Sequence, residues 1–206
     1  GRPVRYSYMN GGSGGGRQSL AEAQFYPNDY DGIWASCPAI NWTQFLASGL
    51  WAVTVMNEYD HILGFHKINA FRDAVHNSVG GKENYFRVEE RIDFDPYTIL
   101  GQKTKGGKIT EKDCLVMQEI WKGPHTTGND FLWYGFLPGG TFWNKIIPIG
   151  SFYYPLIGKR PKCFSLVEQY VHLAFGDPKK DLRHLKIRDF EKVFDTCIRK
   201  LGWLSC

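Results

Sequence analysis

A serine set among glycines near the start of the chain has the residue pattern best suited to chemistry. Residues 11–15 read GGSGG, which satisfies the pattern G-x-S-x-G around Ser13. In that pattern a sharp turn from a strand into a helix exposes the serine hydroxyl, which can then attack an ester carbonyl. The N–H of Gly14 would stabilise the negative oxygen that forms, with a second donor expected before Gly1. We therefore interpret Ser13 as a candidate nucleophile and Gly14 as an oxyanion-hole donor.

Two other interpretations of the glycine run compete with this one. A run of glycine and serine is typical of a flexible linker. A phosphate cradle would need the spacing G-x-x-x-x-G-K-[ST], which is absent, or an acidic residue that ends a second strand. Asp29 precedes the second predicted strand and Asp31 lies at its start, so neither of them ends it. A phosphate site is therefore disfavoured, whereas a linker stays open on these residues alone.

The segments around the serine predict a strand, a tight turn, a helix and a second strand. Residues 4–9 are β-branched and aromatic with a period near two, which indicates a short buried strand. Residues 17–25 are rich in helix formers, and Pro27 ends that pattern. Residues 30–35 indicate a second buried strand. Such a β-α-β unit is the building block of a parallel sheet.

The rest of the chain predicts helices rather than strands. A polar, glycine-containing stretch around residues 77–82 separates the first predicted helix from the others. The apolar patterns that predict helices cover residues 44–55, 109–121, 165–175 and 187–201. We expect an irregular, mostly helical insertion after the β-α-β unit.

The composition narrows the class of protein. Of the 206 residues, 43% are apolar and 22% are charged, which is the usual balance of a globular protein. Aromatic residues reach 16%, which favours an aromatic core or a site for a flat ligand. The net charge of +4 is spread along the chain, so nucleic-acid binding is disfavoured. No stretch approaches 18 consecutive apolar residues, so no membrane span is expected, and no signal-peptide pattern is seen.

The cysteines show no metal-site spacing. They form no C-x-x-C pair, and because their number is odd, at least one thiol has no partner within the chain. The five are Cys37, Cys114, Cys163, Cys197 and Cys206.

Several segments resemble the tannase and feruloyl esterase family, whose members are serine esterases with an α/β-hydrolase core. The similarity begins with YSY at residues 6–8 and GGSGGGRQ at residues 11–18. It continues through AEAQ, then YPNDYDGI at residues 26–33, and PAINW at residues 38–42. A bare linker has no reason to be followed by these segments, so the linker interpretation is disfavoured. Weaker similarity in FDP, YGF and FGDP looks like the family's lid domain.

The resemblance implies a fold of the α/β class. Residues 1–42 would form an α/β-hydrolase core segment of strand, nucleophile elbow, helix and strand. Residues 43–195 would form a large, mostly helical lid domain, and residues 196–206 would start the return to the core. On this expectation the chain is a fragment of the full fold.

The resemblance also implies a reaction. It makes the protein a serine carboxylic-ester hydrolase that cleaves feruloyl, galloyl or related phenolic esters through a Ser13 acyl-enzyme. The family's triad acid and histidine follow the lid, and both are expected outside this chain. No histidine here has the glycine-flanked, cysteine-followed setting of the family's base: His61, His66, His76, His125, His172 and His184 all lack it.

Position 12 departs from the family pattern. Family members typically carry a cysteine there, bonded to one beside the catalytic histidine, whereas this chain has Gly12. Loss of such a cross-link costs about 2 to 4 kcal/mol in the chain-entropy account of disulfides. The alternative function is therefore that of a catalytically inactive relative that binds phenolic or carbohydrate ligands.

The resemblance implies a calcium loop in the lid, before the segment that reads FDP at residues 94–96. Calcium takes six to eight oxygen ligands, several of them carboxylates. Here His76, Val79 and Glu83 stand where the family has acids, so one carboxylate is retained. We therefore expect no metal and no other cofactor.

Aromatic side chains crowd one stretch of the expected lid. The stretch holds Phe131, Trp133, Tyr134, Phe136, Phe142 and Trp143. We name Trp133, Tyr134 and Phe136 as candidate substrate-binding residues, with a place in the lid core as the alternative. The expected partner is a small aromatic ester. The residues give neither an oligomeric state nor a location, and secretion is implied by the resemblance alone.

Overall fold

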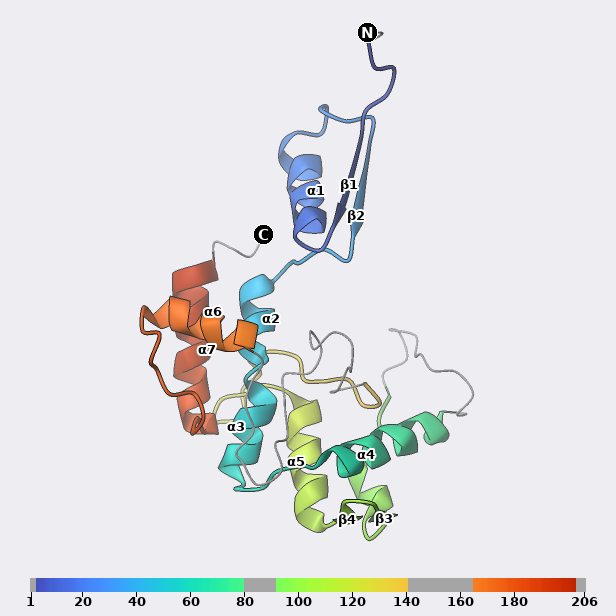
Figure 1. Ribbon diagram of the computed structural model, residues 1–206, viewed down its shortest axis with the longest axis vertical. Helices are drawn as coiled ribbons and strands as arrows, with labels where there is room; N and C mark the ends of the chain where they lie inside the picture. Colours follow the sequence, from blue (N-terminus) through green and yellow to red (C-terminus); the bar gives the residue numbers. More distant parts are fainter. Residues whose placement is uncertain (1–2, 80–91, 141–164, 203–206) are drawn as a thin grey trace.

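A small α/β unit and a larger helical body make up the structure. The computed structural model describes residues 3–79, 92–140 and 165–202. The α/β unit holds the N-terminal part of the chain, and the helical body follows it (Figure 1). The turn that joins the first strand to the first helix lies at the end of the unit nearest the helical body (Figure 1).

The α/β unit consists of strand β1 (Tyr8–Gly12), helix α1 (Gly14–Phe25) and strand β2 (Gly32–Ser36). The two strands pair in parallel along their whole length, and α1 packs against both of them. The predicted β-α-β unit is therefore confirmed. β1 begins later than predicted and α1 begins earlier, because the glycine run ends the strand and starts the helix. The linker interpretation of this run is wrong.

The two strands are less buried than the sequence predicted. The side chains of Tyr8 and Trp34 are each 70% exposed, and Gly11 is the buried residue of β1. The sheet has two strands among the described residues, and one helix packs on it. Side chains on alternate positions point to opposite faces of a sheet, so those on the face away from α1 remain exposed.

Helices dominate the rest of the described chain. They are α2 (Trp42–Ser48), α3 (Trp51–Glu58), α4 (Phe65–Ser78), α5 (Glu111–Lys122), α6 (Ser165–Phe175) and α7 (Ile187–Leu201). The helices predicted at residues 165–175 and 187–201 are confirmed with those boundaries, and the helix predicted at residues 109–121 begins and ends slightly later. The described part of this region is mostly helical, as predicted.

The single helix predicted at residues 44–55 is in fact two helices, α2 and α3. The N–H groups of Gly49 and Leu50 donate to the carbonyls of Leu46 and Ala47, three residues earlier. Such bonds tighten the helical turn and change its direction. The apolar pattern continues across the break, which is why the sequence predicted one helix.

Helix α4 was not predicted. Its buried side chains include Ile68, Phe71 and Val75, which have the spacing of one helical face. The other positions are mostly polar, so the stripe is narrow and was overlooked. Three short elements were also not predicted: the 3-10 helix η1 (Pro96–Ile99) and the antiparallel strands β3 (Lys103–Thr104) and β4 (Gly107–Lys108).

Large aromatic side chains fill the core of the helical body. Trp51 is 1% exposed and Phe190 is fully buried, and their rings meet edge to face with centroids 5.0 Å apart. Phe71 is also fully buried. Burial of a side chain of this size stabilises a fold by about 1.5 to 3 kcal/mol. The contact between Trp51 and Phe190 joins α3 to α7, which are far apart in the sequence.

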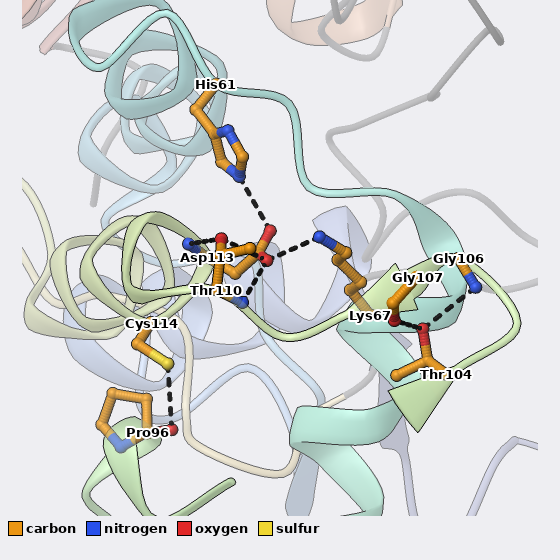
Figure 2. Close-up of polar contacts among 9 residues, drawn as sticks. All are labelled: His61, Lys67, Pro96, Thr104, Gly106, Gly107, Thr110, Asp113 and Cys114. Carbon is orange, nitrogen blue, oxygen red and sulfur yellow. Dashed lines mark hydrogen bonds and ion pairs between the residues drawn. The ribbon is translucent and has the colours of Figure 1, made fainter. Parts of the chain in front are cut away.

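A buried carboxylate joins three further segments. Asp113, in the first turn of α5, has a fully buried side chain. Lys67 Nζ lies 2.6 Å and His61 Nε2 2.8 Å from its carboxylate oxygens (Figure 2). Thr110 donates to the same carboxylate through N and Oγ1 and completes a capping box. Burial alone would raise the pKa of Asp113, but these hydrogen bonds outweigh it and hold the pKa below its usual value.

The domain boundaries drawn from the sequence, at residues 42 and 195, stay predictions. At the first boundary, Thr43 Oγ1 lies 2.8 Å from the Tyr170 hydroxyl and donates to the carbonyl of Leu201. These bonds fasten α2 to α6 and α7. At the second boundary, α7 continues without a break.

Within the part of the chain that the structure describes, none of the helices has the length and apolar character needed to cross a membrane.

Replacing the buried carboxylate should weaken the fold in a pH-dependent way. We expect Asp113→Asn to lower the free energy of unfolding by about 2 to 4 kcal/mol at pH 7, because Lys67 and His61 lose their charged partner. The pKa of Asp113 is lower in the folded than in the unfolded chain, so the stabilisation is present above about pH 4 and is lost as the pH falls through the folded-state pKa. Urea unfolding from pH 2 to 7 measures both effects.

A matched control is Asp195→Asn. Asp195 is exposed and pairs with Arg199 at 2.7 Å on the surface of α7, so its loss should change stability by less than about 1 kcal/mol. Equal effects of the two substitutions would contradict the role given to Asp113.

Candidate active site

The serine of the glycine run occupies a strained turn. Ser13 has φ 54° and ψ −115°, a region that residues with a side chain rarely adopt, and its side chain is exposed. Its N–H donates to the carbonyl of Ser36 at 3.0 Å. Its carbonyl accepts from the N–H groups of Arg17 at 3.1 Å and Ala39 at 3.0 Å. Such strain costs about 1 to 3 kcal/mol and persists only where the surroundings enforce it, as these three bonds do.

Two of the glycines allow the chain to turn so sharply. A Cβ at Gly11 would overlap the carbonyl oxygen of Gly15 and lie 2.5 Å from Ser19 Oγ. A Cβ at Gly16 would lie 2.6 Å from the carbonyl oxygen of Ser36. The backbones of β1, α1 and β2 therefore approach too closely for any side chain at these two positions.

The other glycines of the run are not required in this way. Within 4 Å of a Cβ at Gly12, Gly14 or Gly15 the described residues place no atom, and none of the three has a positive φ. The sharp turn therefore does not need a residue without a Cβ at these three positions. Gly12, which stands where the family has a cysteine, has room for a side chain.

Gly14 is placed as the sequence predicted. It is the first residue of α1, and the first N–H groups of a helix have no acceptor within that helix. These N–H groups also lie at the positive end of the helix dipole, which favours a negative oxygen. The oxyanion-hole role of Gly14 stays a prediction, as does the nucleophilic role of Ser13.

All six histidines lie in the helical body. Five have polar partners among the described residues: Asp113 for His61, Gly139 O for His76, Glu119 and Thr126 O for His125, Lys180 O for His172 and Asp181 for His184. The ring of His66 packs against that of Phe65. Among the described residues, no hydrogen bond joins Ser13 Oγ to a histidine. We assign no histidine as the base.

The three candidate substrate-binding residues line one cavity of about 210 Å³. Trp133 and Phe136 also pack against the hydrophobic core. These two residues therefore both line the cavity and belong to the core, which were the two alternatives drawn from the sequence. Tyr134 is 69% exposed. Phe142 and Trp143 lie outside the described residues.

Residues from other segments complete this cavity. They are Phe45, Ser48, Trp51 and Pro124, and Gly135 joins them from within the aromatic stretch. The sequence analysis missed the first four, because each belongs to another segment and no local pattern links it to the aromatic stretch.

A pair of glycines fixes the wall of the cavity. Gly123 has φ 89°, and a Cβ on either Gly123 or Gly135 would overlap the backbone of the other. The carbonyl of Pro124 accepts from the N–H groups of Leu132 at 2.9 Å and Trp133 at 3.2 Å. The aromatic segment is therefore held against the end of α5 by its backbone, which leaves its rings free to face the cavity.

Only part of the expected calcium loop lies within the described residues. His76 Nε2 lies 3.0 Å from the carbonyl of Gly139, Val79 has no ligand atom in its side chain, and Glu83 lies outside the described residues. In the described ranges no three His, Cys, Asp or Glu side chains gather around a point. The absence of a bound cofactor stays a prediction.

The described thiols differ sharply in access. Cys37 is exposed and free, and it lies beside the turn with φ 36°. Burial raises the pKa of Cys114 to about 11 and that of Cys197 to about 12. Cys163 and Cys206 lie outside the described residues.

Comparison with solved structures defines the class of fold. The chain aligns over 98% of its length with tannin acyl hydrolase from Aspergillus niger, with a TM-score of 0.74 and 19% identity. It aligns over 95% of its length with feruloyl esterase B from Aspergillus oryzae, with a TM-score of 0.68 and 17% identity. It covers 39% of each of those chains. The chain therefore shares its fold with part of each of these proteins.

Sequence comparison then gives the family. Residues 1–88 match the family described as tannase and feruloyl esterase. A probable feruloyl esterase of Arthroderma benhamiae is 34% identical over 96% of the chain, and an uncharacterized esterase of Xanthomonas campestris pv. campestris is 29% identical over 66% of it. The chain belongs to the tannase and feruloyl esterase family. It spans 38% and 25% of the lengths of these two relatives.

The two kinds of glycine in the turn can be separated by substitution. We expect Gly11→Ala to destabilise the protein by more than about 3 kcal/mol or to prevent folding, because the new Cβ overlaps the Gly15 carbonyl. Gly12→Ala should change stability by less than about 1 kcal/mol, because its Cβ meets open space. Thermal unfolding of both variants measures the difference, and similar melting temperatures would contradict the packing described.

Thiol labelling should follow access. We expect iodoacetamide at pH 8 to modify Cys37 in the folded protein and to spare Cys114 and Cys197, because burial excludes the reagent and keeps these thiols protonated. Mass spectrometry of peptides from the folded and urea-unfolded protein checks the order. Fast labelling of Cys197 in the folded state would contradict the packing of α7.

Proposed function

We propose that this chain carries the nucleophile of a carboxylic-ester hydrolase with an α/β-hydrolase core, and that Ser13 is that nucleophile. The single observation that carries the proposal is the conformation of Ser13. Its exposed hydroxyl lies on a strained turn between a parallel strand and a helix, which is the geometry that G-x-S-x-G serves in such enzymes. Backbone strain of this kind clusters at active sites, where the surrounding structure holds it in place.

In the proposed reaction the Ser13 hydroxyl attacks the carbonyl carbon of the ester. A histidine base takes the hydroxyl proton and passes it to the departing alcohol, which leaves an acyl-enzyme. Water then attacks the acyl group with the help of the same base, and the acid is released. The fixed backbone of Ser13 holds the hydroxyl in place before the substrate binds, so little entropy is lost in reaching the attacking geometry.

The N-terminus of α1 would stabilise the negative oxygen of each tetrahedral intermediate. Gly14 N–H is the donor next to the nucleophile, which is its place in the oxyanion holes of this class. Removal of one such donor commonly lowers kcat by a factor of about 100 to 1,000. We place the second donor, the triad acid and the histidine in parts of the protein beyond these residues.

We further propose that the substrate is an aromatic ester. Two relatives are named for it: the Arthroderma protein is a probable feruloyl esterase, and the Aspergillus niger protein is a tannin acyl hydrolase. The cavity lined by Trp133, Tyr134 and Phe136 supports the same class of substrate, because aromatic walls bind a flat ring well.

Labelling by a fluorophosphonate probe tests the nucleophile. We expect the whole protein to be labelled at Ser13, and Ser13→Ala to abolish labelling and to lower kcat on methyl ferulate by about a million-fold. Ser36→Ala is the matched control, since Ser36 is exposed at the end of the neighbouring strand. It should still be labelled.

Two results would contradict the proposal. Hydrolysis by Ser13→Ala at the wild-type rate would remove the nucleophile from Ser13. A whole protein that binds phenolic esters but is neither labelled nor active would be an inactive binding relative.

A further inference from the structure

A tripeptide at the start of α2 has the pattern of an N-glycosylation site. Residues 41–43 read NWT, which satisfies N-x-[ST] with a residue other than proline in the middle. No other asparagine of the 206 residues is followed two positions later by serine or threonine. In this pattern the asparagine receives the sugar, and the transferase must reach the hydroxyl of the third residue. The proposed hydrolysis uses none of these three residues.

The side chain of Asn41 is available for a sugar. It is exposed, and its backbone has φ 48° and ψ 36°, a left-handed conformation that asparagine adopts more readily than most residues. An asparagine that precedes a helix usually accepts a hydrogen bond from one of the first N–H groups. Asn41 makes no such bond, and within the described residues its side-chain amide has no other hydrogen-bond partner. A linked sugar would therefore displace no contact of the fold.

The hydroxyl of Thr43 is in the opposite situation. Thr43 is fully buried, and its Oγ1 lies 2.8 Å from the Tyr170 hydroxyl and donates to the carbonyl of Leu201 at 2.9 Å. Trp42, between the two, packs against the hydrophobic core and stacks on Phe45. In the folded protein a transferase therefore cannot reach the hydroxyl that it needs.

The partners of Thr43 belong to the C-terminal part of the chain. They lie 127 and 158 residues further along the sequence, on α6 and at the end of α7. A chain emerging from the ribosome exposes residues 41–43 before these helices exist, because synthesis proceeds from the N-terminus. Thr43 thus becomes inaccessible only when α2 packs on α6 and α7, near the part of the molecule where the chain leaves the α/β unit (Figure 1).

From these contacts we propose that Asn41 is an N-glycan attachment site, and that the glycan is added before α2 packs on α6 and α7. In the transfer the side-chain amide nitrogen loses a proton and bonds to the anomeric carbon of a lipid-linked oligosaccharide. The bond from that carbon to phosphate breaks, and the lipid diphosphate leaves. The proposal therefore includes passage through a secretory pathway that supplies this donor. It goes beyond the proposed function and does not depend on Ser13.

Mass spectrometry of the secreted whole protein tests the site. The protein is secreted from yeast and treated with peptide-N-glycosidase in heavy-oxygen water, which converts a glycosylated asparagine into aspartate that carries the heavy oxygen. We expect the heavy label at Asn41 and a lower apparent mass on a gel after treatment. An unlabelled Asn41 in the secreted, folded protein would overturn the inference.

Two variants separate the sugar from the fold. Asn41→Asp removes the amide nitrogen but suits the left-handed backbone, so the shift in apparent mass should vanish while the melting temperature equals that of the enzymatically deglycosylated protein. Thr43→Ser keeps a hydroxyl for the transferase and for both buried bonds, and it should retain the shift. A shift of the same size in Asn41→Asp would place the glycan elsewhere and overturn the inference.

The order of modification and folding has a separate test. Whole protein from bacteria, which is folded and carries no sugar, is incubated with purified oligosaccharyltransferase and its lipid-linked donor. An unstructured N-x-T peptide in the same tube shows that the transferase is active. We expect the peptide to be modified and the folded protein to be spared, because Thr43 is buried. Equal modification of the two would overturn the proposed order.

Discussion

The backbone of Ser13, held at φ 54° by three hydrogen bonds, is the constraint on which the candidate site depends. The bond to Ser36 exists only because β1 and β2 are parallel, since parallel strands end side by side at the same edge of the sheet. The bond to Ala39 ties the chain after β2 to the same turn. Gly11 and Gly16 let the three backbones meet. Strand pairing, helix packing and the exposure of the hydroxyl are thus parts of one arrangement.

The segments of the helical body are positioned by buried polar contacts as well as by the aromatic core. Asp113 gathers α4, α5 and the loop after α3 around one carboxylate, whose cost of burial is offset by four donors (Figure 2). Gly123 and Gly135 bring two backbones into contact and so set the wall of the aromatic cavity. In both parts of the molecule, close backbone approach decides where the functional side chains lie.

The chain belongs to the tannase and feruloyl esterase family, but it spans 38% of the Arthroderma relative and 39% of the Aspergillus niger protein, so the activity is a property proposed for the whole protein. Gly12 illustrates what geometry adds. The resemblance implies a cysteine at this position, and the structure shows that the position has room for a side chain, so glycine is not required by the turn itself.

The sequence by itself determined the β-α-β unit, the place of Ser13 at its turn and the two C-terminal helices, because these depend on local periodicity, glycine and proline. It also singled out Trp133, Tyr134 and Phe136. Only the tertiary structure decided that Phe45 and Trp51 complete their cavity, that two of the five glycines are indispensable, and that five of the six histidines have polar partners within the helical body. Those facts depend on contacts between segments far apart along the chain, which local patterns do not record.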